Sequence, residues 1–72
     1  MSEPLNWDAT YAIAKALIYQ YPDVKLEDVS LRQVYLWTIG LPDFSDDPLI
    51  ANEGILEDIY KVWFEETIHD DK

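Results

Sequence analysis

The clearest indication of the fold lies in residues 53–68, EGILEDIYKVWFEETI. Apolar side chains recur there at intervals of three and four residues: Ile55, Leu56, Ile59, Val62 and Trp63. Residues at this spacing share one face of an α-helix, and such a face is buried in a globular protein. Asn52 precedes the stretch and belongs to the residue types that cap a helix start. We therefore predict a helix over about 53–68 that packs on a core.

Toward the N-terminus, a similar pattern predicts a first helix that ends near Tyr21. Asn6 or Asp8 can cap its start, because either side chain can accept an early backbone N–H. One arc of the helical wheel holds Ile13, Ala14, Leu17, Ile18, Tyr21 and Tyr11. Pro22 ends the helix, because the residue before a proline is pushed away from helical dihedrals.

Residues 30–40 predict a second, shorter helix. Ser30 and Gln33 fit a capping box, in which each side chain bonds the backbone N–H of the other residue. Gly40 is expected to end the helix, since glycine adopts a left-handed C-terminal conformation without strain. The inward arc of this helix consists of Leu31, Val34, Tyr35, Thr38, Ile39 and Leu41. Trp37 falls off that arc, and we expect it at the edge of the core.

Two segments connect these helices. Residues 22–29 form a connector with a short turn, and residues 41–52 form a loop in which a helical turn begins at Pro48, a residue type suited to a first helical position. No strict alternation predicts a strand. We expect an all-α, three-helix domain over residues 1–72, with flexible ends at 1–6 and 69–72.

The composition limits what the protein can do. Of 72 residues, 49% are hydrophobic and 14% aromatic, which suits one small folded domain whose core includes Trp7, Trp63, Tyr21 and Tyr35. Cysteine is absent and His69 is the single histidine, so thiolate-ligated centres, histidine cages and catalytic triads are excluded. No stretch approaches the roughly 18 apolar residues that span a bilayer, and no targeting segment opens the chain. We expect a soluble, cytoplasmic protein without membrane partners.

The charge argues against nucleic-acid binding. Five basic against 15 acidic residues give a net charge of −10, which repels phosphate backbones. Three helices suggest a helix-turn-helix module, but such modules need basic residues on the recognition helix. The second helix offers Arg32 alone and the third offers Lys61 among acids. We expect a basic protein surface or a cation as the partner instead.

Six acidic residues, three in the loop before the third helix and three at the start of that helix, form the principal candidate site. They are Asp43, Asp46, Asp47, Glu53, Glu57 and Asp58, with no basic residue between them. Glu53 and Glu57 are a like-charge i,i+4 pair, which destabilises a helix by roughly 0.2–0.5 kcal/mol. A solvated face that keeps the protein soluble is the alternative. The concentration of acids into one segment favours a partner-binding face.

The same carboxylates offer an oxygen-rich surface for a cation. The EF-hand resemblance of residues 43–47 fails, because Pro48 and Gly54 stand where the loop needs a glycine and a glutamate. Weak binding of Mg²⁺, Ca²⁺ or Fe²⁺ is one interpretation, and no specific metal site is the other. The weak ligand set would be Asp43, Asp46, Asp47, Glu53 and Glu57. No tightly bound cofactor is expected.

Catalysis is not indicated. No nucleophile–base pair, phosphate-cradling glycine loop or dinucleotide fingerprint is present, and so small a chain leaves little room for a dry pocket. We expect a protein that is not an enzyme.

Phe64 falls on the outward side of the third helix, next to the Glu53 and Glu57 stripe. An exposed aromatic beside acids is typical of an interface anchor within a charged rim. A single exposed Phe near a helix end is also ordinary. Phe64 is therefore a candidate apolar contact of the partner-binding face.

A pattern of residues extends over nearly the whole chain. It consists of Trp7, Ile13, Ala16, Leu17, Tyr21, Pro22, Asp23, Val29, Trp37, Leu41, Asp43, Phe44, Asp46, Asp47, Pro48, Asn52, Glu53, Ile55, Leu56, Glu57, Ile59 and Trp63. With these residues the chain resembles the IscX family, small acidic proteins encoded with bacterial iron–sulphur cluster assembly machinery. The run from Asp43 to Glu57 makes the resemblance specific. Lys15 and Tyr19 depart from the acids that the family often carries on the outer face of the first helix.

The resemblance implies a helix-turn-helix or winged-helix-like topology without DNA binding. It also implies that the acidic face docks on a basic patch near the active site of an IscS-type cysteine desulfurase, the pyridoxal-phosphate enzyme that supplies sulphur. There the family competes or cooperates with frataxin and ferredoxin.

Two hypotheses follow for this chain, which we expect to be a monomer. The first is a non-catalytic adaptor or regulator that binds the desulfurase through Asp43, Asp46, Asp47, Glu53, Glu57 and Asp58, with Phe64 as an apolar contact. The second is a weak Fe(II)-binding iron donor or carrier that uses the same carboxylates. A scaffold that holds a cluster is excluded, because the chain has no thiolate ligand.

Overall fold

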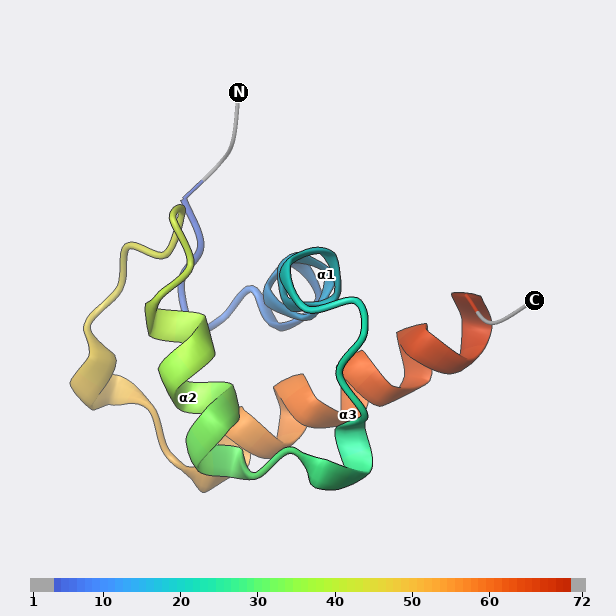
Figure 1. Cartoon of the computed structure of the whole chain (residues 1–72). Coiled ribbons are helices and arrows are strands. Elements are labelled where there is room, and N and C mark those ends of the chain that lie inside the picture. Colours follow the sequence, from blue (N-terminus) through green and yellow to red (C-terminus); the bar gives the residue numbers. More distant parts are fainter. Residues whose placement is uncertain (1–3, 71–72) are drawn as a thin grey trace.

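The chain folds into three α-helices joined by segments that each contain one turn of 3₁₀ helix. The computed structural model describes residues 4–70, with side chains as far as Ile68. In chain order the elements are α1 (Thr10–Gln20), η1 (Leu26–Asp28), α2 (Leu31–Ile39), η2 (Pro48–Ile50) and α3 (Glu53–Asp70) (Figure 1). The predicted all-α, three-helix domain is confirmed, as are the short turns in the two connecting segments. Within the described residues, no helix is long and apolar enough to cross a membrane.

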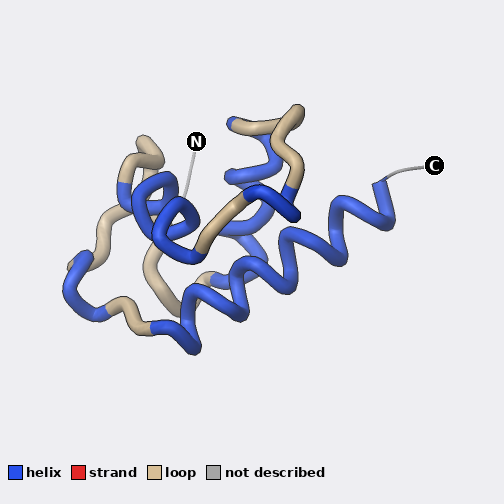
Figure 2. Tube along the Cα trace, turned by 60° about the horizontal axis from the view of Figure 1, so that its bottom comes forward, coloured by secondary structure: helices blue, strands red, loops and turns tan. Residues whose placement is uncertain are grey.

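α3 is the element on which the other two helices pack. α1, seen end-on in Figure 1, makes the more extensive contact with it, and α2 packs on it beside α1. α1 and α2 contact each other only slightly. The turned view in Figure 2 shows α3 running along one side of the molecule beneath the shorter elements. The domain is flattened, with extents of 34 × 29 × 16 Å.

The core lies where the three helices meet. Its buried apolar residues are Trp7, Ile13, Ala14, Leu17, Leu26, Val34, Leu41, Leu56, Ile59 and Trp63. Burial of each large apolar side chain contributes about 1.5–3 kcal/mol relative to exposure. Trp37 lies at the edge of this core as predicted, with its ring centroid 4.4 Å from that of Tyr21 and 6.2 Å from that of Trp63.

α2 begins with the predicted capping box. The Ser30 hydroxyl accepts the Gln33 backbone N–H at 3.2 Å, and the Gln33 side-chain oxygen accepts the Ser30 N–H at 3.1 Å. Gly40 follows the last helical residue as predicted, but its dihedrals are φ −88° and ψ −3°. The expected left-handed conformation is therefore wrong, because the Gly40 N–H still bonds the Leu36 and Thr38 carbonyls in a right-handed turn.

The start of α1 differs from the prediction. The helix begins at Thr10 after Ala9, and neither Asn6 nor Asp8 caps it. Asn6 instead closes a local turn, since its side-chain oxygen accepts the Asp8 N–H at 3.1 Å and its carbonyl accepts the Ala9 N–H at 2.9 Å. Tyr11 was expected on the inward arc, but it is exposed. It lies at the margin of that arc, whereas the buried residues Ala14 and Leu17 lie at its centre.

The segment before α1 is held against the loop that follows α2. The Leu5 N–H donates to the Asp43 carbonyl at 2.8 Å, and the Leu5 carbonyl accepts the Ser45 N–H at 2.9 Å. These bonds form a parallel bridge between Leu5 and Phe44. Leu5 is thus bonded to the loop after α2, and the flexibility expected of residues 1–6 and 69–72 stays a prediction. Of the predicted flexible ends, residues 1–3 and 71–72 lie outside the described residues.

Candidate protein-binding surface

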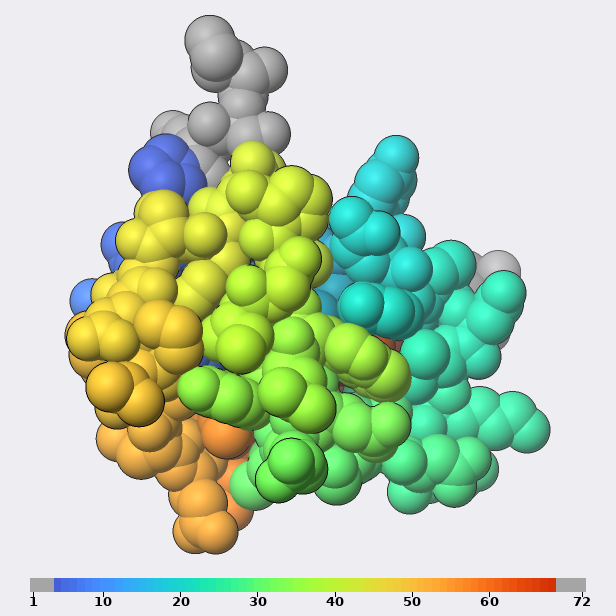
Figure 3. Space-filling view, turned by 60° about the vertical axis from the view of Figure 1, so that its left-hand side comes forward, coloured from blue at the N-terminus to red at the C-terminus, as the bar shows by residue number. Residues whose placement is uncertain are grey.

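The acidic connector, residues 40–52, carries three of the six predicted site carboxylates. It leaves the end of α2, passes along the outer side of that helix through η2, and enters α3 (Figure 1). Figure 3 shows its side chains as a continuous surface beside those of α2. The connector therefore forms one edge of the flattened molecule.

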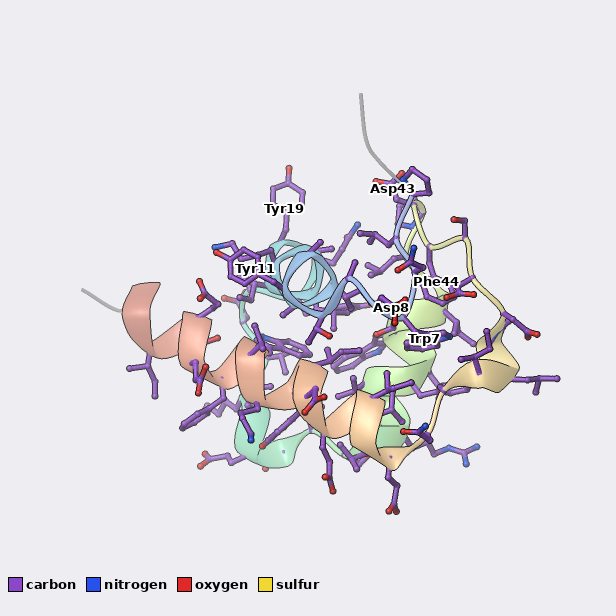
Figure 4. The ribbon with its side chains drawn as sticks, turned by 180° about the vertical axis from the view of Figure 1, so that it is seen from behind. Trp7, Asp8, Tyr11, Tyr19, Asp43 and Phe44 are labelled. Carbon is purple, nitrogen blue, oxygen red and sulfur yellow. The ribbon has the colours of Figure 1, made fainter. Side chains whose placement is uncertain are left out.

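Trp7 attaches this connector to the core. The indole is 3% exposed, and its Nε1–H donates to the Asp47 carbonyl at 2.8 Å. Its ring stacks on Tyr35 of α2, with centroids 6.2 Å apart, and meets the edge of Phe44 at 4.8 Å. Figure 4 shows Trp7 between the helices and Phe44. One buried indole thus joins the N-terminal segment, α2 and the connector.

Asp46 and Asp47 hold the backbone of the connector. The Asp46 carboxylate accepts the Trp7 N–H at 3.0 Å with one oxygen and the Asp47 N–H at 2.7 Å with the other. The Asp47 carboxylate accepts the Leu49 N–H at 3.0 Å, which caps η2. These two residues therefore have structural roles that the sequence did not indicate, in addition to their charge.

The remaining four carboxylates are exposed to solvent. Asp43 lies at the start of the connector, beside the N-terminal segment (Figure 4), whereas Glu53, Glu57 and Asp58 follow on the first two turns of α3. We call the six residues Asp43, Asp46, Asp47, Glu53, Glu57 and Asp58 the acidic band. The structure thus spreads the predicted site along an edge instead of gathering it at one point.

No basic side chain neutralises the acidic band in the part of the chain that the structure describes. The one ion pair among residues 4–68 joins the Lys15 ammonium to the Glu66 carboxylate at 3.6 Å, between α1 and the second half of α3. The Tyr11 hydroxyl also lies 3.5 Å from Glu66. Lys15 therefore offsets an acid outside the acidic band.

The carboxylates of the acidic band do not converge on one point in the described part of the chain. Among the described residues, no three acidic or histidine side chains are close enough together to hold a cation. The predicted ligand set Asp43, Asp46, Asp47, Glu53 and Glu57 is dispersed over the connector and α3, and the Asp46 and Asp47 oxygens already accept backbone N–H groups. A cation could contact single carboxylates of this set, as at any acidic surface.

Phe64 is exposed, as predicted, but it lies away from the connector. It is 50% exposed in the second half of α3, where it lines a groove of about 270 Å³ with Ile68 and η1. The connector enters the opposite end of that helix (Figure 1). Phe64 is thus remote from Asp43, Asp46 and Asp47.

Two exposed apolar residues were missed by the sequence analysis. Leu49 is 87% exposed and Ile50 is 53% exposed, both on η2 in the middle of the acidic band. The signal in the sequence is an Asp–Pro turn start followed by two large apolar residues inside an acidic segment. Leu49 and Ile50 belong to no periodic apolar pattern, so an analysis of helix faces does not identify them.

The sequence of this domain matches a known family. A sequence model described as iron–sulphur cluster assembly matches residues 5–68, which include the whole acidic band and Trp7. The chain belongs to the iron–sulphur cluster assembly family. An uncharacterized protein of Pseudomonas aeruginosa is 37% identical over 62 residues, which cover 86% of this chain and 94% of that protein. The iron–sulphur cluster assembly part of the predicted resemblance is confirmed.

Proposed function

We propose that this member of the family is a non-catalytic adaptor or regulator that docks its acidic band on a basic patch of an IscS-type cysteine desulfurase. The observation that carries the proposal is the acidic band itself, six carboxylates along the connector and the start of α3 that form no ion pair among the described residues. The choice of enzyme comes from the resemblance to the IscX family. A role in cluster assembly rests on the family match.

The electrostatics of the band suit such a partner. The net charge of −10 produces a long-range field that accelerates association with a basic surface and orients the encounter. A carboxylate that already pairs with a base of its own protein must lose that ion pair to bind a partner. Among residues 4–68, the carboxylates of the acidic band form no such ion pair. The carboxylates of the acidic band are spread over the connector and the start of α3. They therefore suit a partner whose basic residues form an extended patch better than a partner with one basic residue.

The connector provides a rigid base for docking. Trp7, Asp46 and Asp47 fix its backbone through hydrogen bonds of 2.7–3.0 Å. A surface that is ordered before binding loses less conformational entropy on association. We propose that the protein acts as a monomer in the cytoplasm, where it competes or cooperates with frataxin and ferredoxin for the enzyme.

Non-catalytic action is part of the proposal. The chain has no cysteine. Asp43 lines an open hollow of about 330 Å³ with Leu5, Tyr19 and Leu41, and no second carboxylate of the described residues lines that hollow to form an acid–base pair with it. An iron donor that uses the same residues is the alternative, and it requires carboxylates that converge on one ion.

A salt series of binding measurements with the cysteine desulfurase tests the proposal. Wild-type protein should bind the immobilised enzyme at low salt and lose affinity steeply as salt rises, because the screening length falls from about 30 Å at 0.01 M to about 3 Å at 1 M. An affinity that does not change with salt concentration, or no binding at all, would reject docking on this enzyme through charge.

A matched pair of variants locates the surface. D43N/E53Q/E57Q removes three exposed charges of the acidic band and spares the backbone bonds of Asp46 and Asp47. D23N/E27Q/D28N removes three exposed charges around η1 and changes the net charge equally. We expect about tenfold weaker binding for the first variant and nearly wild-type binding for the second. Equal losses would show that net charge alone matters.

Titration with Fe(II) distinguishes the iron-carrier alternative. Saturable binding that resists excess Mg²⁺, followed by NMR shifts confined to the acidic band, would favour the carrier. Diffuse, weak shifts along the band are the expected result, because the described carboxylates do not converge on one point.

A further inference from the structure

Leu49 and Ile50 form an apolar tip on η2. At 87% exposed, Leu49 is the most exposed large hydrophobic residue in the described part of the chain, and Ile50 beside it is 53% exposed. A single exposed leucine is ordinary in a soluble protein, but two adjacent aliphatic side chains on a projecting turn place a contiguous apolar surface in water.

The tip is held in one conformation. The Asp47 carboxylate accepts the Leu49 N–H at 3.0 Å, and the Asp47 carbonyl accepts both the Ile50 N–H at 3.1 Å and the Trp7 indole N–H at 2.8 Å. Pro48 fixes its own φ within the same turn. Because Trp7 is buried in the core, the turn is anchored to the core, and the two side chains are presented on a fixed backbone.

The surroundings of the tip determine what it can bind. Asp46 and Asp47 directly precede the turn in the chain, and Glu53 comes three residues after Ile50, so the segment that carries the apolar pair is acidic. Protein interfaces place apolar anchors at the centre and charged groups at the rim, where the anchors provide most of the binding energy. A second copy of this chain would bring like charges together around the tip. The complementary partner is a protein surface with an apolar recess bordered by Lys or Arg.

We propose that Leu49 and Ile50 are the apolar contact of the acidic band, inserted into an apolar recess within the basic patch of the partner. This inference rests on the proposed function and assigns the apolar contact to η2, whereas the sequence made Phe64 a candidate for that contact. Phe64 is remote from the three connector carboxylates, while Leu49 is bonded to one of them.

Substitution of the tip tests the assignment in the same desulfurase binding assay. L49Q/I50Q should weaken binding about tenfold, mainly through faster dissociation, because removal of a central apolar contact affects the bound state. The dependence of affinity on salt should stay as in the wild type, because no charge changes. F64Q/I68Q, which removes two exposed apolar residues at the other end of α3, should bind nearly as the wild type does.

Two controls keep the assay specific. Circular dichroism and tryptophan fluorescence should show that both double variants fold, since the substituted side chains are solvent-exposed. The conservative variant L49M/I50V should retain binding, because it preserves apolar surface on the same turn.

The outcomes separate this inference from the proposed function. If the wild type binds the enzyme and L49Q/I50Q binds equally well, the inference is wrong and the proposed function stands. If F64Q/I68Q loses affinity while L49Q/I50Q does not, Phe64 is the contact. If sedimentation shows that the wild type is a dimer and that L49Q/I50Q is a monomer, the tip mediates self-association and the inference is wrong. Failure of the wild type to bind would overturn both proposals.

Discussion

The indole N–H of Trp7 donates a hydrogen bond of 2.8 Å to the backbone carbonyl of Asp47, a residue 40 positions further along the chain. The same carbonyl accepts the Ile50 N–H, and the Asp47 carboxylate caps the turn that carries Leu49. A buried residue before α1 therefore determines how an exposed surface before α3 is presented. This relationship links the core of the domain to its proposed docking surface.

Replacement of Trp7 by phenylalanine should loosen the connector. W7F leaves the Asp47 carbonyl without its indole partner and leaves part of the indole volume empty. We expect the free energy of unfolding in urea to fall by about 1–3 kcal/mol. Amide hydrogen exchange at Asp46, Asp47, Leu49 and Ile50 should accelerate more than exchange in α3. As a control, W37F removes a tryptophan at the edge of the core. In W37F, exchange in the connector should accelerate no more than exchange in α3, because only global unfolding becomes easier. Equal acceleration in both variants would contradict the anchoring role of Trp7.

Replacement of Thr38 by valine should stabilise the protein. The Thr38 side chain is fully buried on α2, and its hydroxyl has no hydrogen-bond partner among the described residues. Valine has nearly the same shape and removes the unsatisfied polar group, so we expect a gain of about 1 kcal/mol in urea unfolding. The T38S variant keeps the hydroxyl and removes a methyl group, and it should be less stable than the wild type. A loss of stability in T38V would indicate that the hydroxyl has a partner in solution.

Replacement of Gly40 by alanine should be tolerated. Its φ of −88° is open to any residue, and an added Cβ would lie 3.4 Å from the nearest atom, the Leu36 carbonyl oxygen. Alanine restricts the unfolded chain, so we expect G40A to unfold at the same or a higher urea concentration, with a gain of up to about 1 kcal/mol. A large loss of stability would instead favour the left-handed conformation that the sequence suggested.

Added salt should stabilise the domain. A net charge of −10 makes the folded chain repel itself, and the single ion pair among residues 4–68, between Lys15 and Glu66, is a small opposing term of about 0–1 kcal/mol. The thermal midpoint should therefore rise as NaCl is increased from about 0.01 M to about 0.3 M, since screening weakens the repulsion. The D43N/E53Q/E57Q variant should show a smaller rise. A midpoint that falls with salt would mean that ion pairs outweigh repulsion.

Local interactions were predictable from the sequence because their partners are close in the chain. Ser30 and Gln33 are three residues apart and form the predicted capping box. Asn52 accepts the Ile55 N–H at 2.9 Å and caps α3 as predicted. The apolar faces of α1 and α3 were recognisable from their periodicity, and Ile13, Leu17, Ile59 and Trp63 are buried accordingly.

Interactions between distant segments were not predictable in this way. No sequence pattern indicates that Leu5 pairs with Phe44, or that Trp7 bonds Asp46 and Asp47. These contacts explain why two acids that looked like free ligands also support the backbone. They also hold the backbone of the turn on which Leu49 is 87% exposed.

The bridge at Leu5 and the anchor at Trp7 place a long-range constraint in the first few residues. A shortened chain that began at Asp8 would retain the sequence of all three helices, yet its connector would lose the backbone and indole bonds that fix it. Such a truncation would also remove the buried Trp7 indole from the core, so it would weaken the fold and the presentation of the connector together. Substitutions at Leu5 or Trp7 can therefore change how the acidic band is presented without altering any carboxylate of that band.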